Sequence, residues 1–413
     1  MNEDTPPLAP IQREPTTRLF IKVFHSFDEA EPFRSDWDNL LVRTHALVYV
    51  SFDWCRIWWK YYGAGRSLHL ILCYREAELV GIFPGFIEVL RLGLAWVRAA
   101  KLVGSDCSIN LCNVPALPDS LRDVMSRAIN HFIGRHRCDL LIVGPMSGLL
   151  DQTPEYVESG NCEAKLVERT QVLGDACNTF FKLPSTYVQY VQAISKQPRG
   201  NLNRSLVQFA KSHNVTFDVV SDPAMLEAAF DEFKTLHDIQ WRAEGKLGHF
   251  GDWPMSGQFT REVVTTLGAL GQVRFYRIIA DGKVVSSQYC LAFQGTNYWR
   301  LPARVYGKEW DKLSLGRMGL AKMIEACIGE GIDTVEGGRG HYPYKVQFGA
   351  SELPLRCVQF VRRATGVSLR VKAFIASARL LDLLYYRLLF RRIAPKVPFL
   401  RRPLWSLWIR STW

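Results

Sequence analysis

The chain has 413 residues, of which 48% are hydrophobic, and a formal net charge of +11. A chain this long and apolar can bury a large core, which excludes a disordered protein, a collagen and a small disulfide scaffold. Its length predicts two or three domains. No apolar run reaches the roughly 18 residues of a membrane-spanning helix. Residues 1–17 are acidic and proline-rich and lack the features of a secretory signal, so we expect a disordered N-terminus and a cytosolic protein.

The first half of the chain alternates apolar runs with amphipathic segments. Short apolar runs predict strands, and apolar residues at helical spacing predict helices. The predicted strands are residues 18–24, 68–74, 79–89 and 140–143, and the predicted helices are residues 29–43, 52–62 and 120–137. Residues 147–174 have weak periodicity and form the predicted connection between the two halves.

The second half repeats this order of elements. The predicted strands are residues 215–220, 273–280, 284–293, 297–304, 332–336 and 357–363, and the predicted helices are residues 223–245, 258–270 and 315–329. Asp281-Gly282 separates two strands and is a strong hairpin signal. Each half gives a strand, helices, an antiparallel meander, a helix and another strand. The order predicts an α+β fold of two similar domains, residues 18–180 and 181–365.

The tail, residues 366–413, is strongly basic and rich in aromatic side chains. It holds ten basic residues and one acid, Asp382, so it carries +9 of the net +11 and leaves the rest of the chain almost neutral. A near-neutral body argues against a nucleic-acid-binding surface. Two interpretations of the tail stay open. It either contacts an anionic membrane peripherally, on the inner face, or is a helix packed on the domain with a solvated basic face.

The ten cysteines are scattered and none forms C-x-x-C. The nearest pair, Cys107 and Cys112, lacks a matching second pair. We therefore expect small buried thiols in a reducing compartment and no metal.

A first candidate site is the start of the helix that follows the meander. Gly316 and Gly319 let the backbone approach a ligand closely, and the free amides and dipole of a helix start favour a phosphate or pyrophosphate. Arg317 adds a positive charge. The alternative is an ordinary helix capped by Ser314, with glycines that serve packing.

A second candidate is the glycine-rich segment 335–345. Glu336 stands at a predicted strand end, where a carboxylate can accept a proton from an attacking amine or hydroxyl. His341, Tyr344 and Lys345 follow and can also hold or move protons. The alternative is a turn in which Arg339 and Glu336 merely pair.

A third candidate is the pair His237 and Trp241, which share one face of a predicted helix. That face either lines a pocket, with His237 as an acid, base or donor, or is an aromatic stripe of the core. The sequence has no G-x-S-x-G, H-E-x-x-H or Walker A pattern, so hydrolase, zinc-protease and nucleotide-triphosphatase functions lose their usual support.

Taken together, four segments resemble acetyltransferases of the CelD, or cellulose-biosynthesis, type. They are residues 236–250 (LHDIQWRAEGKLGHF), the hairpin 275–293, the Ser-Leu-Gly at 314–316 and residues 331–345, which end in Pro-Tyr-Lys. That family belongs to the GNAT superfamily and is related to the FemAB peptidyltransferases. The resemblance is close over residues 201–349 and looser over residues 18–143.

The resemblance implies tandem GNAT-like domains, each a mostly antiparallel twisted sheet flanked by helices, followed by a basic helical tail. It implies acetyl-CoA or another acyl-CoA as donor, with the pyrophosphate at the helix start. The residues so implicated are Ser314, Leu315, Gly316, Arg317, Met318 and Gly319. The family commonly has Ser-Pro-Gly where this chain has Ser-Leu-Gly, and Asp where Glu336 stands.

We therefore expect an acyltransferase in which an acceptor amine or hydroxyl attacks the thioester directly. Glu336 is the first candidate for the base, His237 the second and His341 the third. Tyr344 is assigned to protonating the thiolate or holding the acceptor. The remaining candidate substrate-binding residues are Trp241, Arg339 and Lys345.

The acceptor is expected to be a small molecule or a saccharide, in line with a role in envelope or exopolysaccharide metabolism. Two rival functions remain. One is a FemAB-like transferase that uses aminoacyl-tRNA, and the other is a non-catalytic assembly factor for polysaccharide synthesis.

Overall fold

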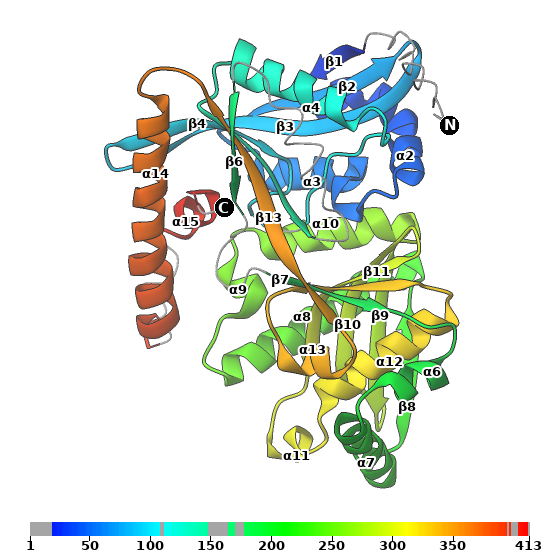
Figure 1. Cartoon of the computed structure of the whole chain (residues 1–413). Coiled ribbons are helices and arrows are strands. Elements are labelled where there is room, and N and C mark those ends of the chain that lie inside the picture. The colour runs from blue at the N-terminus through cyan, green and yellow to red at the C-terminus, as the bar shows by residue number, and fades with distance from the viewer. Residues whose placement is uncertain are drawn as a thin grey trace, which may run out of the picture.

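The computed structural model describes residues 19–107, 111–147, 164–169, 177–394, 396–397 and 404–411, with only the backbone of residues 164–169 (Figure 1). The predicted disordered segment 1–17 and most of the predicted connection 147–174 lie outside these residues. The described strands form one 13-stranded sheet in the order β1-β2-β3-β4-β5-β13-β7-β12-β11-β10-β9-β8, with β6 also paired to β13. The predicted fold class, an α+β fold with a mostly antiparallel sheet flanked by helices, is confirmed.

The N-terminal half is an antiparallel meander whose last strand runs parallel to its neighbour. Its strands are β1 (Phe20–Phe24), β2 (Ser67–Arg75), β3 (Glu78–Leu92), β4 (Ala95–Leu102), β5 (Leu140–Ser147) and β6 (Ala164–Arg169). Its helices are α1 (Phe27–Ala30), η1 (Glu31–Phe33), α2 (Arg34–Arg43), η2 (Val48–Val50), α3 (Phe52–Tyr62), α4 (Leu121–Ile129) and the π-helical turn η3 (Asn130–Arg135).

Alternation along β2 sets the two faces of this half. Leu70 and Leu72 pack in the core that contains α2 and α3, whereas Ile71 and Cys73 pack in the core beneath α4. Successive strand residues point to opposite faces, so a run of buried apolar residues requires helices on both sides.

The C-terminal half is a second meander with helices on both faces. Its strands are β7 (Cys177–Lys182), β8 (Val215–Val220), β9 (Val273–Ala280), β10 (Lys283–Phe293), β11 (Thr296–Arg304) and β12 (Thr334–Arg339). Its helices are α6 (Tyr187–Ala193), α7 (Lys196–Ser212), α8 (Pro223–Ala243), α9 (Gly248–Asp252), α10 (Ser256–Ala269), α11 (Lys308–Asp311), α12 (Leu315–Gly329) and α13 (Pro343–Gln347). The Asp281-Gly282 turn joins β9 to β10, and both residues have positive φ, as predicted for this hairpin.

The two halves share a core and a strand. One hydrophobic cluster includes Trp54 of α3 and Phe259 of α10, whose ring centroids are 5.9 Å apart. Strand β13 (Ser351–Arg362) pairs with β7 at one end and with β5 and β6 at the other. In Figure 1 it runs from the lower half of the molecule into the upper half. A strand late in the sequence therefore completes the sheet of the N-terminal half, and the halves are not independent units.

Some observed elements differ from those expected. β12 continues through Gly337 and Gly338 to Arg339, where the sequence predicts a turn, and the register shifts between Glu336 and Gly338. The helices α6 and α7 and the strands β4 and β7 were not predicted. β7 spans the predicted domain boundary at residue 180 and pairs with β12, so it belongs to the sheet of the C-terminal half.

The described part of the tail is helical and packs on the N-terminal half. It comprises α14 (Val367–Leu381), the π-helical η5 (Asp382–Ile393) and α15 (Trp405–Ser411). Val371 and Phe374 of α14 are buried against β4, β5 and β13. Three residues of the tail, Arg401, Arg402 and Trp413, lie outside the described residues. None of the described helices is both long and apolar enough to cross a bilayer.

The last helix closes a buried ionic cluster. Arg410 donates to Glu88 Oε2 from Nε at 2.8 Å and from Nη2 at 2.6 Å. Glu88 also pairs with Arg66 and Lys101, and all three side chains are almost fully buried. Asp106 joins the same cluster; burial would raise the pKa of its carboxyl, but Arg66 and Lys101 lower it to about 2.

We expect Arg410→Leu to lower the free energy of unfolding by about 2 kcal/mol, because it removes two hydrogen bonds to a buried carboxylate that keeps its other cations. The measurement is urea denaturation of the full chain. Arg391→Leu, at an exposed arginine of the same tail, is the control and should change stability by less than about 0.5 kcal/mol. Equal effects of the two variants would contradict the docking role of Arg410.

Candidate active site

The start of α12 presents free backbone amides. Ser314 has a left-handed backbone (φ 55°, ψ 40°), which turns the chain into the helix. The first hydrogen bonds of the helix run from the amides of Arg317 and Met318 to Ser314 O, at 2.9 and 3.1 Å. The backbone amides of Leu315 and Gly316 precede these two residues, so they have no carbonyl acceptor within the helix. Free amides and the dipole of a helix start favour an anion there.

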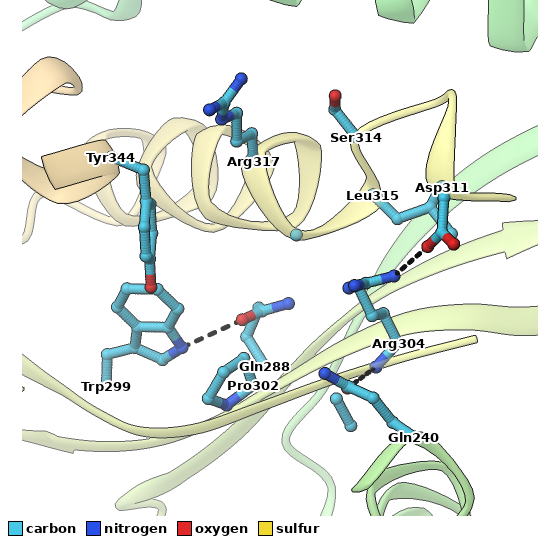
Figure 2. Close-up of a pocket in the computed structure, with 12 residues that line it drawn as sticks. Gln240, Gln288, Trp299, Pro302, Arg304, Asp311, Ser314, Leu315, Arg317 and Tyr344 are labelled. Atoms are coloured by element: carbon cyan, nitrogen blue, oxygen red, sulfur yellow. Dashed lines mark hydrogen bonds and ion pairs between the residues drawn. The ribbon is translucent and has the colours of Figure 1, made fainter. Parts of the chain in front are cut away.

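A cavity of about 340 Å³ opens at this helix start (Figure 2). Its walls come from α8, β10, β11, α11, the turn before α12, the first turn of α12, and α13. The lining residues are Gln240, Gln288, Trp299, Pro302, Ala303, Arg304, Asp311, Ser314, Leu315, Gly316, Arg317 and Tyr344.

The cavity has a charged end and an aromatic end. At the charged end Arg304 pairs with Asp311 at 3.1 Å, and its backbone amide donates to Gln240 Oε1 at 3.0 Å. Arg317 lies on the first turn of α12 and is exposed, and no ion pair of Arg317 is seen among the described residues. At the aromatic end Trp299 Nε1 donates to Gln288 Oε1 at 3.0 Å, and Tyr344 stands over the Trp299 ring (Figure 2).

The six predicted cofactor-binding residues divide between cavity and core. Ser314, Leu315, Gly316 and Arg317 line the cavity, whereas Met318 is fully buried. Among the described residues, a Cβ on Gly316 would meet only the Arg304 side chain, with Cδ at 3.7 Å and Nε at 4.0 Å. A Cβ on Gly319 would lie 2.5 Å from Gln288 Nε2 and 2.7 Å from Ser286 Oγ, so a larger residue would displace these side chains where α12 packs on β10.

Strands β11 and β12 separate next to the aromatic end. They pair in parallel only between residues 296–298 and 334–336, and β11 then continues to Arg304 paired with β10 on its other side. The side chain of Lys345 lies at this separation. Its Nζ donates to Gly337 O and lies 5.2 Å from the centroid of the Trp299 ring. Burial lowers the pKa of Lys345 to about 8, although the charge of Glu336 acts to raise it.

The buried amine of Lys345 gives a pH dependence of stability. In the unfolded chain a lysine stays protonated to about pH 10.4, whereas the folded chain releases this proton near pH 8. The unfolded state therefore binds more protons than the folded state between these two pH values. The free energy of unfolding of the wild type rises with pH in that window, and this gain disappears as the pH falls back to 8. We expect the wild type to gain about 1 kcal/mol per pH unit relative to Lys345→Met from pH 8 to pH 10. Urea denaturation of both proteins at pH 7.5, 8.5 and 9.5 measures this; a constant difference would contradict it.

Glu336 points to the opposite face of the sheet. Its Oε2 accepts from Tyr49 Oη at 3.0 Å, and its Oε1 accepts from Asn178 Nδ2 at 2.6 Å and from the Gly338 amide at 2.9 Å. Arg300 donates to Tyr49 Oη at 2.8 Å. Burial raises the pKa of Tyr49, so this phenol stays protonated and acts as a donor.

This cluster lines a small cavity of about 30 Å³, with Leu111, Pro145 and Arg339 also in its wall. It shares no lining residue with the cavity at α12. Trp299 and Arg300 are consecutive in β11 and line one cavity each. The two sites therefore lie back to back across the gap between β11 and β12. Lys345 lies in this gap, where the charge of Glu336 acts to raise its pKa.

The other predicted residues lie elsewhere. His237 is buried in α8 between Phe233 and Phe250, and burial lowers its pKa to about 4. Within the described chain its Nδ1 has no hydrogen-bond partner. Trp241, one turn further along, is partly buried beneath Lys246. His341 is exposed and its Nδ1 contacts Glu352 Oε1 at 2.8 Å.

Several site residues were missed by sequence reasoning. Arg304 and Trp299 belong to β11 and both line the cavity at α12. They are five residues apart, so strict alternation would place them on opposite faces, but a register shift against β10 between Trp299 and Leu301 brings them to the same one. Tyr49, Asn178 and Arg300 surround Glu336 although they lie in three separate segments. Of these residues, only Arg304 could have been predicted from the sequence, because it is a basic residue at a strand end shortly before the Ser-Leu-Gly turn.

Known proteins resemble this chain in one domain and in the overall fold. Residues 196–346 match the family model of the acetyltransferase (GNAT) domain, a segment that contains both β11 and β12 and the start of α12. Among solved structures, FemX is similar with a TM-score of 0.58 and 8% identity, over 82% of this chain and 97% of that one. A conserved protein of unknown function from Bacteroides thetaiotaomicron VPI-5482 is similar with a TM-score of 0.50 and 9% identity, over 80% and 97%.

No protein in the search of curated sequences matches this chain significantly. At these identities the structural similarities establish the fold alone. The family match extends only over residues 196–346 and leaves the CelD type unconfirmed. The chain thus carries a GNAT-type acetyltransferase domain, and this domain supports an acyltransferase.

Proposed function

We propose that the protein is an acyl-CoA-dependent acyltransferase that acts on an amine or a hydroxyl. The observation that carries the proposal is the cavity at the start of α12, which joins an anion-binding end to an aromatic end beside the separated strands. A diphosphate linked to a narrow, mostly apolar arm that ends in a thioester matches this shape and polarity. The family match to an acetyltransferase domain over the same residues supports it.

In the proposed arrangement the donor and the acceptor approach from opposite faces of the sheet. The diphosphate lies at Leu315 and Gly316, between Arg304 and Arg317, and the arm runs past Trp299 to the gap between β11 and β12. The acceptor enters beside Tyr49 and Arg300, where polar side chains suit a hydroxyl-bearing molecule. Passage of the thioester requires the Lys345 side chain to move out of the gap.

The reaction needs positioning and proton transfer. The acceptor nitrogen or oxygen forms a bond to the thioester carbon, and the carbon–sulfur bond breaks. Glu336 takes the acceptor proton, directly or through one water, and the Tyr344 phenol gives its proton to the departing thiolate. Burial raises the pKa of Tyr344, which keeps the phenol protonated in the resting site. We assign His237 and His341 no proton transfer, because one is enclosed in an aromatic core and the other is at the surface.

The donor is tested by calorimetry of the full chain with acetyl-CoA, with CoA and with pantetheine, which lacks the diphosphate. We expect binding of the first two and at least about tenfold weaker binding of pantetheine. The absence of heat and of a thermal shift with both acetyl-CoA and CoA would refute the proposal. Transfer from charged tRNA without any CoA binding would favour the FemAB-like alternative instead. Capture of envelope-synthesis proteins without CoA binding would favour the assembly factor.

We also propose that the tail contacts an anionic membrane surface. Leu380, Leu383, Leu384 and Leu388 are exposed on the helical tail, Leu383 by 55%. Together with Leu404 and the hairpin residue Leu92, part of this surface lines an apolar groove of about 490 Å³. The exposed arginines Arg379, Arg387, Arg391 and Arg392 are interspersed along the same segment. Leucines between arginines combine apolar insertion with attraction to acidic headgroups.

Vesicle co-sedimentation tests this surface in the full chain. We expect the wild type to pellet with phosphatidylglycerol vesicles and much less with phosphatidylcholine vesicles. The triple variant Leu383→Ser, Leu384→Ser, Leu388→Ser and the double variant Arg391→Gln, Arg392→Gln should each pellet less. The variant Lys283→Gln, on the hairpin of the C-terminal half, is the charge control. Equal pelleting of wild type and both tail variants would refute membrane contact.

A further inference from the structure

Four of the nine histidines gather at one edge of the N-terminal half. His25 follows β1, His69 lies near the start of β2, and His131 and His136 lie in and just after the turn η3. The ring centroid of His69 is 4.8 Å from that of His25, 5.1 Å from that of His131 and 4.5 Å from that of His136. The cluster therefore joins three segments that are far apart in sequence, which is why spacing did not reveal it.

The π-helical turn is what brings two of these rings together. The amide of His136 donates to His131 O at 3.0 Å, an i→i+5 bond. In an α-helix two residues five apart differ by about 140° around the axis. The wider π turn places them on one side, and the two ring centroids are 4.5 Å apart. A glycine, Gly85, pairs with His69 across the sheet, where a Cβ would lie 2.5 Å from the neighbouring Phe132 ring.

The nitrogen atoms of three rings are near enough to share one ion. Selected ring nitrogens of His69, His131 and His136 all lie within 4.8 Å of one another. His131 Nε2 is 3.1 Å from His69 Nδ1. Zinc–nitrogen bonds of 2.0–2.1 Å in a tetrahedron place two ligand nitrogens about 3.3 Å apart. His136 is only half-buried and follows the turn, so a small rotation of its side chain closes the remaining distance.

Neighbouring groups orient the rings. His69 Nε2 lies 3.2 Å from Ser67 Oγ, which can accept its proton and leave Nδ1 with a lone pair toward the cluster. His25 Nδ1 lies 2.8 Å from Leu68 O. A carbonyl only accepts, so this Nδ1 carries the proton and Nε2 of His25 is the acceptor. Hydrogen bonds of this kind fix the tautomer of metal-ligating histidines.

The charges around the cluster select the kind of ion. His69 and His131 are buried, and a metal-ligating imidazole is neutral, so binding places no additional positive charge in the interior beyond the ion itself. The three candidate ligands are all imidazoles, which suit Zn²⁺ and disfavour Ca²⁺ or Mg²⁺. The cations Arg98 and Arg135 act on the same rings and reduce the affinity for a divalent ion.

We propose that His69, His131 and His136 bind one Zn²⁺ ion, with His25 or water in the fourth position. The ion ties the edge formed by β1 and β2 to the turn after α4. In Figure 1 these elements lie at the opposite end of the molecule from α12, so the site stabilises the N-terminal half and takes no part in acyl transfer.

The test uses tag-free full-length protein that has been dialysed against a chelator and then given Zn²⁺. We expect about one Zn²⁺ per chain by elemental analysis after gel filtration, and a higher melting temperature than for the metal-free protein. His136→Gln removes one ligand at a half-exposed position and should weaken binding by at least about tenfold. His213→Gln, a histidine of the C-terminal half that contacts Asp281, is the matched control and should bind normally.

Two outcomes would overturn the site. One is a wild-type zinc content no higher than that of His136→Gln, and the other is an equal loss in the His213→Gln control. Co²⁺ gives a readout that does not depend on any variant folding. Intense visible absorption of the Co²⁺-loaded wild type is expected for tetrahedral nitrogen ligation, and a spectrum like that of aqueous Co²⁺ would also refute the proposal.

Discussion

The variant Gly316→Asp should lose CoA binding while keeping its fold. A Cβ at Gly316 has room, and an acidic side chain in the first turn of a helix is favourable for the helix itself. The same carboxylate would stand where the proposed diphosphate lies, and placing like charges together costs several kcal/mol. We expect the Kd for CoA to rise about 100-fold, which corresponds to about 2.7 kcal/mol. Calorimetry gives the Kd, and circular dichroism with thermal melting checks the fold.

Gly316→Ala is the matched control, because it adds the same Cβ without the charge. Alanine is also the better helix former, so this variant should be at least as stable as the wild type. Its Kd for CoA should stay within about threefold of the wild-type value. If Gly316→Asp binds CoA as well as Gly316→Ala does, the start of α12 does not hold the diphosphate and the proposed donor site is wrong.

The sequence predicted this end of the site well because its signals are local. A strand, a short turn and a helix that begins at Leu315 follow one another in the chain. Free amides at a helix start require only that the helix forms there. The hairpin at Asp281-Gly282 was predictable for the same reason, since two consecutive residues with positive φ determine it. Local rules of this kind do not depend on which distant segments pack nearby.

The sequence could not predict the environment of Glu336, because tertiary contacts make it. Tyr49 and Asn178 reach this carboxylate from segments 287 and 158 residues away. The strand β12 also runs through two glycines that ordinarily end a strand, because they form a bulge against β7 in which Gly338 has a φ of 80°. Its pairing places Glu336 on the face opposite α12. The histidine cluster escaped prediction for a similar reason, since it depends on a π-helical turn that no local pattern announced.

Glu336→Gln should reduce kcat about 100-fold or more while leaving the Kd for acetyl-CoA unchanged. Removing a general base costs typically 10²–10⁴ in rate. Glu336 lines none of the donor cavity, so donor binding has no reason to change. Glutamine has the same shape; its oxygen can still accept from Asn178 and Gly338, and its amide can donate to Tyr49 Oη. The measurement is CoA release from acetyl-CoA by chromatography, with water and with glucosamine as acceptors.

Tyr49→Phe separates a catalytic role of Glu336 from a structural one. It removes one hydrogen bond to the carboxylate and leaves Arg300 without its phenol partner, but it keeps the base. We expect a loss of about 1–3 kcal/mol in unfolding free energy and a smaller loss of kcat than in Glu336→Gln. A structural role for Glu336 predicts the reverse order: both variants destabilised and kcat retained in Glu336→Gln. That result would remove Glu336 as the base and leave the gap at Lys345 as the place to search for another.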